Sequence, residues 1–258
     1  MKRVFILLSL LFCATAVAHT VTWYDNNVVV RTDTCDYGDY LNPPTPTSKY
    51  GYTFSHWEAR SLYTPVEYIE TPGHLYVDTG IVPDVDNIEF EISFRAVTGS
   101  NYLFQSRETQ GSGINGVSGA NSGSTIALTY MGKTLTSGLS RVAGNDYFIR
   151  ATLNNGVSTL YVENRTTGET NTVTGTYNFN ANNLNSVPIC LFGNTAGNTI
   201  KQGVRIYYAK MKINNSLVMD YTPVKRNTDN KAGFLDSVSG AFKVGSSISY
   251  FLMAGPEL

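Results

Sequence analysis

The sequence predicts an all-β protein, and three observations support this fold class. The composition combines β formers with turn formers, since the 258 residues include 17 Tyr, 12 Phe and 23 Gly. Most of the chain divides into short aromatic and β-branched segments separated by Gly and Asn. No window of useful length has helical periodicity. Many short strands over about 190 residues indicate an antiparallel β-sandwich or barrel.

The first element is not part of this fold. Residues 1–18 have the three parts of a secretory signal peptide, with Lys2 and Arg3 before an apolar run and Ala16-Val17-Ala18 as small residues for cleavage. We therefore expect the mature protein to begin at His19 and to be secreted, extracellular or on the cell surface.

Two membrane alternatives are not expected. Lipidation at Cys13 is disfavoured because Phe12 occupies the preceding position, where a small residue is needed. The apolar run of the signal is too short for a membrane span, and no later segment is long and apolar enough.

Export leaves a weakly acidic chain with two cysteines. Removing residues 1–18 leaves 17 of the 19 Lys and Arg against 20 Asp and Glu, a net charge of about −3. This balance argues against nucleic acid or an anionic membrane as a partner. Cys35 and Cys190 are interpreted as two separate half-buried thiols, with a disulfide between them as the alternative.

Residues 19–58 form the first predicted unit, a small β module. "VTWYDNNVVVRT" predicts a hairpin, and Phe54 and Trp57 are its expected core. The stretch "VTWYDNN…YGDYLNPPTPTSKYGYTFSHW", residues 21–57, resembles the Listeria–Bacteroides repeat of bacterial surface proteins and internalin B repeats. That resemblance implies a β-grasp-like module, which a linker at residues 59–65 joins to the second domain.

Residues 66–258 form the second predicted domain, which begins with the clearest strand patterns. "VEYIETPGHLYVDTGIVP" predicts a strand, a Pro-Gly turn and a strand, with an expected core of Tyr68, Leu75, Val77 and Ile81. "NIEFEISFRA" alternates strictly. The residues expected to face the core are Ile88, Phe90, Ile92 and Phe94, and those expected to face outward are Asn87, Glu89, Glu91, Ser93 and Arg95. Further strands are predicted at "NYLFQS", "TIALTYM", "YFIRATLN", "STLYVENRT", "ETNTVTGTYNF", "VPICLFG", "VRIYYAKMKIN" and "LVMDYTPV".

The C-terminal stretch predicts closure of this domain by its own ends. Polar turns at residues 226–231 and 237–240 flank a short strand at Gly233-Phe234-Leu235. They return the chain so that residues 248–253, "ISYFLM", lie beside residues 66–69, with Phe251 buried.

The two ends of the domain also carry a family resemblance. "VEYIETPGHLYVDTGIVP" and "RIYYAKMKINNSLVMDYTPVKRNTDNKAGFLDSVSGAFKVG…FLMAGP" are similar to the concanavalin A-like, laminin-G-like domain of secreted gut-bacterial proteins and some phage fibres. The resemblance spans residues 66–256 and implies an antiparallel jelly-roll β-sandwich. It says little about activity, because this fold hosts lectins, glycosidases, adhesion modules and spacers.

Two carboxylates are the only residues that suggest catalysis. Glu89 and Glu91 share one face of a strand, as the nucleophile and the acid/base of retaining glycosidases on this fold do. Those enzymes carry a third acid on the same face, where this chain has Asn87. A solvated outer face is therefore the preferred interpretation.

Metal and nucleophilic sites are not expected. The carboxylates near strand ends that might hold calcium are Asp78, Asp84, Asp86 and Asp220. Calcium at Asp84-Val85-Asp86-Asn87 stays a minor alternative, because the loop lacks the full calcium-binding pattern. The histidines His19, His56 and His74 are too scattered for zinc or a catalytic triad. Residues 111–124, "GSGINGVSGANSGS", predict a surface loop.

The many tyrosines suggest recognition. Aromatic rings stack on the apolar side of pyranose rings while polar side chains bind the hydroxyls. The candidates for such a surface are Tyr102, Tyr130, Tyr147, Tyr161, Tyr207 and Tyr208, although core packing is the simpler interpretation of each.

The sequence therefore predicts a non-enzymatic recognition or adhesion protein of lectin-like type on the bacterial surface or outside the cell. Its expected partner is a glycan or a host or cell-surface protein, without a cofactor. The alternatives are a structural spacer or matrix module and, as a minor one, a glycoside hydrolase.

Overall fold

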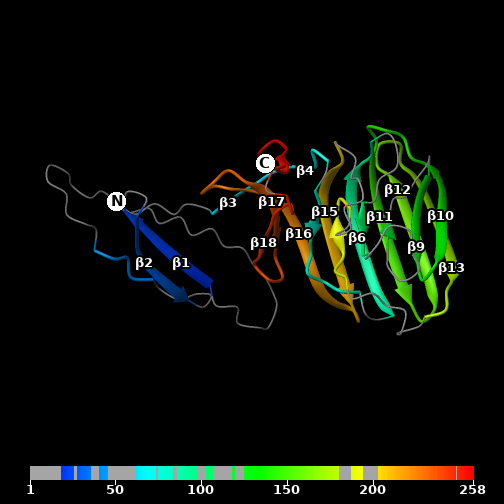
Figure 1. Cartoon of the computed structure of the whole chain (residues 1–258), viewed down its shortest axis with the longest axis horizontal. Helices are drawn as coiled ribbons and strands as arrows, with labels where there is room; N and C mark the ends of the chain where they lie inside the picture. Colours follow the sequence, from blue (N-terminus) through cyan, green and yellow to red (C-terminus); the bar gives the residue numbers. More distant parts are fainter. Residues whose placement is uncertain are drawn as a thin grey trace. The chain divides into compact units, whose positions relative to one another are not determined.

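The computed structural model describes twelve stretches of the chain, with gaps between them. They are residues 19–25, 28–35, 41–45, 62–73, 75–83, 86–97, 103–106, 118–119, 125–179, 187–193, 203–247 and 249–258. The chain divides into two compact units, Met1–Arg60 and Ser61–Leu258. Within the described residues every regular element is a β-strand (Figure 1), and none is a helix that could cross a membrane.

The first unit contains the predicted hairpin. Strands β1 (His19–Asp25) and β2 (Val28–Cys35) pair antiparallel, with a shift in register between Trp23 and Tyr24. Asp33 anchors one face of the hairpin, because its carboxylate accepts hydrogen bonds from the Trp23 indole at 2.7 Å and from Arg31. Residues 1–18, Phe54, Trp57 and most of the loop 111–124 lie outside the described residues.

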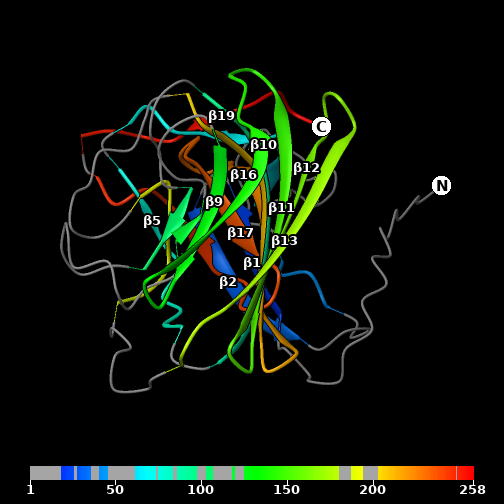
Figure 2. The ribbon, with the colours of Figure 1, turned by 90° about the vertical axis from the view of Figure 1, so that its right-hand side faces the viewer.

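The second unit is an antiparallel β-sandwich of two sheets (Figure 2). Among the described residues the larger sheet has 11 strands, and eight of them follow the order β13-β12-β11-β6-β15-β16-β17-β18. These eight strands are β13 (Glu169–Thr176), β12 (Val157–Asn164), β11 (Asp146–Asn154), β6 (Asn87–Arg95), β15 (Arg205–Ile213), β16 (Ser216–Arg226), β17 (Ala232–Asp236) and β18 (Phe242–Lys243). The other three are β3 (Tyr63–Pro65), β4 (Ile69–Glu70) and β19 (Met253–Ala254). β3 pairs with β16, and β4 lies between β15 and β19. The fold class predicted from the sequence is confirmed.

The smaller sheet covers the other side of the core. The part of the chain that the structure describes contributes six strands to it, in the order β10 (Lys133–Ser140), β9 (Thr125–Tyr130), β8 (Ser118–Gly119), β7 (Phe104–Gln105), β14 (Cys190–Leu191) and β5 (Val77–Asp78). β10 was not among the predicted strands, because "KTLTSGLS" carries few apolar residues. Met131 and Gly132 turn the chain between β9 and β10 with positive φ angles of 46° and 72°.

The predicted alternation of β6 holds with one exception. Ile88, Phe90, Ile92 and Phe94 are buried. Ser93, predicted to face outward, does so but is also buried, because Arg165 covers it and donates a hydrogen bond to its hydroxyl at 3.1 Å. In the core, the Phe90 ring meets Phe104 of the smaller sheet with their centroids 4.1 Å apart.

Two details of the predicted start of the domain are corrected. Tyr63–Pro65, placed in the linker by the sequence, pairs with Val224–Arg226 of β16. Tyr68, predicted to be core, is half-buried, with its ring under the guanidinium of Arg205 at 4.3 Å. Leu75 and Val77 are buried as predicted, whereas Ile81 is only partly buried.

The two ends of the domain meet, as predicted, but in a shifted register. Met253 and Ala254 of β19 pair with Glu70 and Ile69 of β4, and Val66 bridges to Glu257. The prediction that Phe251 is buried was wrong, because Phe251 is 60% exposed and its neighbour Leu252 is the buried residue.

The two described cysteines lie in different units. Cys35 is half-buried in the first unit, and Cys190 is fully buried in β14. The interpretation as two separate thiols, with a disulfide as the alternative, stays a prediction.

Candidate functional site

Charged and aromatic side chains of the second unit lie together on the outer face of the larger sheet. We use "outer face" for the side of β4, β15, β6, β11 and β12 that points away from the core. Alternation along these strands directs Glu91 and Arg95 of β6 and Asp146, Phe148 and Arg150 of β11 to this side.

A β-bulge gives this face an additional aromatic residue. Along β15, Ile206 pairs with Phe94 and Tyr208 pairs with Ser93, so Tyr207 is an extra residue in the strand. Tyr207 and Tyr208 therefore both turn outward, although they are adjacent in sequence. Tyr207 donates a hydrogen bond from its hydroxyl to Asp146 Oδ1 at 2.7 Å, and Tyr208 packs toward Phe148.

Phe148 is the centre of an aromatic cluster on the outer face. Its ring centroid lies 6.0 Å from that of Tyr161 and 6.4 Å from that of Tyr208. Arg165, from the turn after β12, places its guanidinium carbon 5.1 Å from the Phe148 centroid and 5.9 Å from the Tyr208 centroid. Although it points away from the core, Phe148 is only 6% exposed, because these neighbours cover it. We call Phe148, Tyr161, Tyr208 and Arg165 the aromatic cluster.

Arg165 is a cation without a carboxylate partner among the described residues. Its Nη1 donates to Ser93 Oγ at 3.1 Å, and its Nη2 lies 3.5 Å from the Tyr208 hydroxyl. Arg150, the other arginine near Phe148, is paired with Glu91 at 2.6 Å.

Next to the aromatic cluster, four charged residues form a line across four strands. Glu70 of β4 pairs in register with Arg205 of β15, Arg205 with Arg95 of β6, and Arg95 with Asp146 of β11. We call this line the arginine row. The Arg205 Nε donates to Glu70 at 2.6 Å, and Arg95 donates two hydrogen bonds of 2.8 Å to Asp146.

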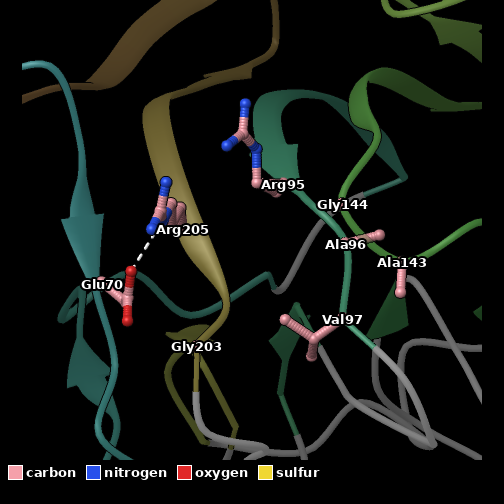
Figure 3. Close-up of a pocket in the computed structure, with 8 residues that line it drawn as sticks. All are labelled: Glu70, Arg95, Ala96, Val97, Ala143, Gly144, Gly203 and Arg205. Carbon is pink, nitrogen blue, oxygen red and sulfur yellow. Dashed lines mark hydrogen bonds and ion pairs between the residues drawn. The ribbon is translucent and has the colours of Figure 1, made fainter.

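The arginine row borders a pocket with a volume of about 390 Å³, shown in Figure 3. The pocket lies where β6 ends and where β11 and β15 begin. Its charged lining consists of Glu70, Arg95 and Arg205, and the remainder is small or apolar: Ala96, Val97, Ala143, Gly144 and Gly203. Both guanidinium groups lie on the same side of their adjacent strands (Figure 3).

The arginine row changes the proton affinities of its members. The hydrogen bonds from Arg95 lower the pKa of Asp146, and the bond from Tyr207 adds to this, although desolvation opposes both. Burial, followed by the bond to Asp146, raises the pKa of Tyr207. Asp146 therefore stays ionised to a lower pH than an ordinary aspartate.

This lowered pKa predicts an acid-sensitive contribution to stability. A carboxylate whose folded pKa is depressed stabilises the fold above its unfolded pKa, and this contribution is lost as the pH falls through the folded pKa. We expect Asp146→Asn to be less stable than the wild type near neutral pH and closer to it in acid, in thermal unfolding followed by circular dichroism. The same stability gap at both pH values would contradict the assignment.

The two carboxylates considered for catalysis lie on the outer face in ion pairs. Glu89 accepts a hydrogen bond from Lys212 Nζ at 2.7 Å, and Glu91 accepts one from Arg150 Nε at 2.6 Å. Each acid is thus held by a cation on a neighbouring strand, as expected for a solvated sheet face.

The predicted calcium candidates have other partners. Asp86 accepts hydrogen bonds from the Tyr177 hydroxyl and from the Gly156 amide, and so ties the turn after β11 to the start of β6. Asp78 accepts from the Gly80 amide at 2.7 Å, and Asp220 pairs with Lys210 at 3.3 Å. No group of three or more possible metal ligands occurs in the described part of the chain. Asp84, His56 and His74 lie outside it, and nothing is described of the His19 side chain.

The tyrosine candidates divide between core and outer face. Tyr130 and Tyr147 are buried in the core, whereas Tyr161, Tyr207 and Tyr208 are half-buried on the outer face. Tyr102 lies outside the described residues.

Sequence reasoning missed Phe148, Arg165 and the arginine row. The sequence carries a weak signal for Phe148. Tyr147 and Phe148 are adjacent in "YFIRATLN", and adjacent residues of a strand point to opposite faces of the sheet, so one of these two aromatic residues has to face outward. For Arg165 and the arginine row we find no sequence signal, because residues 70, 95, 146, 165 and 205 meet only through strand pairing.

The comparisons with known proteins identify no family. No protein-family model matches the chain, and no curated protein matches it. The resemblance of residues 21–57 to the Listeria–Bacteroides repeat therefore stays a prediction.

Solved structures with low similarity exist. The carbohydrate-binding module CBM40 of a Ruminococcus gnavus IT-sialidase, bound to α2,3-sialyllactose, is 13% identical with a TM-score of 0.44, over 59% of this chain and 91% of that one. The enzymatically active domain of tailspike protein 2 of bacteriophage CBA120 is 16% identical with a TM-score of 0.40, over 64% of this chain and 31% of that one. A GH43 protein, a BlXynB mutant from Bacillus licheniformis, is 8% identical with a TM-score of 0.34, over 49% of this chain and 27% of that one. Similarity at this level gives no information about the ligand or activity of this chain.

Proposed function

We propose that this is an exported, non-enzymatic recognition protein whose outer face binds carbohydrate. The observation that carries the proposal is the β15 bulge, which turns Tyr207 and Tyr208 outward beside Phe148 and Arg165. A strand without the bulge would direct one of these tyrosines into the core. Bulges that re-aim side chains are common next to functional sites.

The chemistry of this surface suits a sugar. Pyranose rings present C–H groups to aromatic side chains, while their hydroxyls bind planar polar groups. The aromatic cluster offers the partly exposed rings of Tyr161 and Tyr208, and the Arg165 guanidinium beside them supplies N–H donors. Rings held in place by a stacked arginine lose little conformational freedom when a ligand binds.

The ion pairs of Glu89 and Glu91 favour recognition over hydrolysis. A retaining glycosidase needs two carboxyl groups that face the glycosidic bond, one as nucleophile and one as acid. Here Lys212 and Arg150 each hold one of these carboxylates on the sheet surface. We therefore propose a binding function and no catalytic step.

A glycan array with purified protein tests the proposal. We expect binding to a restricted set of glycans, and a loss of about tenfold or more in affinity in Tyr208→Ala, because the variant removes the aromatic ring and a contact of Arg165. The matched control is Tyr250→Ala, which removes an exposed tyrosine from the C-terminal segment and should bind as the wild type does.

Two results would count against this function. An array without any bound glycan would favour the alternative of a structural spacer. Equal loss of binding in Tyr208→Ala and Tyr250→Ala, with both variants folded by circular dichroism, would exclude the outer face as the binding surface.

A further inference from the structure

We infer that the pocket beside the arginine row binds the carboxylate of an acidic sugar, through Arg95 and Arg205. This inference rests on the proposed function, because it names the class of carbohydrate that the outer face would take. The ligand would be a hexuronic or nonulosonic acid residue within a glycan.

Both arginines have N–H donors left for a ligand. Arg205 uses Nε for Glu70, which leaves its Nη1 and Nη2 without a hydrogen-bond acceptor among the described residues. Arg95 binds Asp146 through Nε and Nη2, which leaves Nη1. A carboxylate accepts such donors through two oxygens, and the flat guanidinium group matches this geometry.

The placement of the two arginines makes an anion between them favourable. They are direct partners across β6 and β15, and like charges in that position repel each other. Glu70 and Asp146 are the two ends of the row, so neither acid lies between the two arginines. A carboxylate near the centre of the row would reduce this repulsion.

The charges around the pocket also limit what can bind. Glu70 and Asp146 balance the two arginines. The hydrogen bonds to Asp146 are the main cause that raises the pKa of Arg95, and Glu67 is a further acid close enough to add to it. The site therefore lacks a net positive field that would collect small anions from a distance. We expect free sulfate or acetate to bind weakly, and a ligand to need a sugar ring as well as the carboxylate.

The pocket has room for such a ring. Its volume of about 390 Å³ lies in the lower part of the range for small-molecule sites. Part of its lining consists of residues with small side chains or none, namely Ala96, Ala143, Gly144 and Gly203. There is open space above Gly144, where an added Cβ would meet nothing within 4 Å.

The aromatic cluster is within reach of the same ligand. Ser93, which accepts a hydrogen bond from Arg165, is two residues from Arg95 on the same face of β6, a separation of about 7 Å. A glycan of two or more sugars can span this distance. A carboxylate at the pocket would therefore place the adjoining ring beside Tyr208.

The test compares acidic sugars with their uncharged counterparts by titration calorimetry on the purified protein. The probes are trigalacturonic acid and its methyl ester, oligosaccharides ending in glucuronic acid or in N-acetylneuraminic acid with their neutral parents, and sodium sulfate. We expect at least one acidic sugar to bind more tightly than its uncharged counterpart, by about tenfold or more. Sulfate should bind no more tightly than this uncharged sugar.

Two variants probe the pocket itself. Glu70→Gln/Arg205→Gln removes one complete ion pair and keeps the net charge, and Ala143→Phe fills the pocket without touching a charge. Both should remove the preference for the acidic sugar. The control Glu89→Gln/Lys212→Gln removes an ion pair between β6 and β15, about 20 Å from Arg95 along β6, and should keep the preference.

The outcomes separate this inference from the proposed function. Binding of acidic and neutral sugars with equal affinity, dependent on Tyr208, would overturn the inference and leave the proposed function intact. Absence of binding to every sugar would overturn both. Sulfate binding as tight as that of the acidic sugar would also overturn the inference, because the pocket would then bind any small anion.

Discussion

Replacing Phe90 by alanine is expected to lower the free energy of unfolding by about 3–5 kcal/mol. Phe90 is 1% exposed in β6, and its ring centroid lies 4.1 Å from that of Phe104, which β7 contributes from the smaller sheet. The pair therefore joins the two sheets in the middle of the core. Both strands are held by hydrogen-bonded neighbours, so the core cannot collapse fully into the space that alanine would leave.

Urea unfolding followed by circular dichroism measures this loss. The matched control is Phe251→Ala, the same substitution at a side chain that is 60% exposed, for which we expect a change within about 0.5 kcal/mol. Equal losses in the two variants would contradict the position of Phe90 between the sheets.

The sequence predicts the strands because burial leaves a local pattern. Alternation in residues 87–95 is enough to predict which residues of β6 face the core, without knowledge of the partner strands. Likewise, the short strand around Phe234 and the polar turns on both sides of it were predicted correctly. In these places the hydrophobic effect and the turn residues act over a few neighbouring positions.

The candidate site could not be predicted in the same way, because it depends on which strands pair. "RIYYAKMKI" reads as a simple strand, and only its register against β6 reveals that Tyr207 is an extra residue. Glu70 and Asp146 become ends of one row through three separate pairings. Phe251 was placed wrongly for a related reason. Aromatic content alone does not say which residue of a terminal segment faces the core, and here it is Leu252.

The second large effect is expected at the C-terminus of the chain. Deleting residues 252–258 should destabilise the second unit by about 2–5 kcal/mol or more. The deletion removes Leu252, which is 7% exposed, together with β19. It also removes the partners of the segment before β4, where the Glu67 amide donates to Pro256 O and the Tyr68 carbonyl accepts from the Gly255 amide, both at 2.9 Å.

The truncated protein should also aggregate more readily. β4 pairs with β15 on one side and with β19 on the other, so the deletion turns β4 into an unpaired edge. Free strand edges with apolar residues offer hydrogen-bonding groups to other chains. Light scattering at increasing protein concentration measures this effect.

Two leucines of the same segment provide the matched comparison. Leu252→Ala should reproduce a large part of the lost stability, whereas Leu258→Ala should not, because Leu258 is 83% exposed. Hydrogen exchange on the intact protein gives an independent readout. The amides of Glu67 and Gly255 should exchange slowly, since both are bonded across the closure between the two ends of the domain. Exchange of these amides at the rate of an unstructured peptide would mean that the C-terminal segment does not close the sheet.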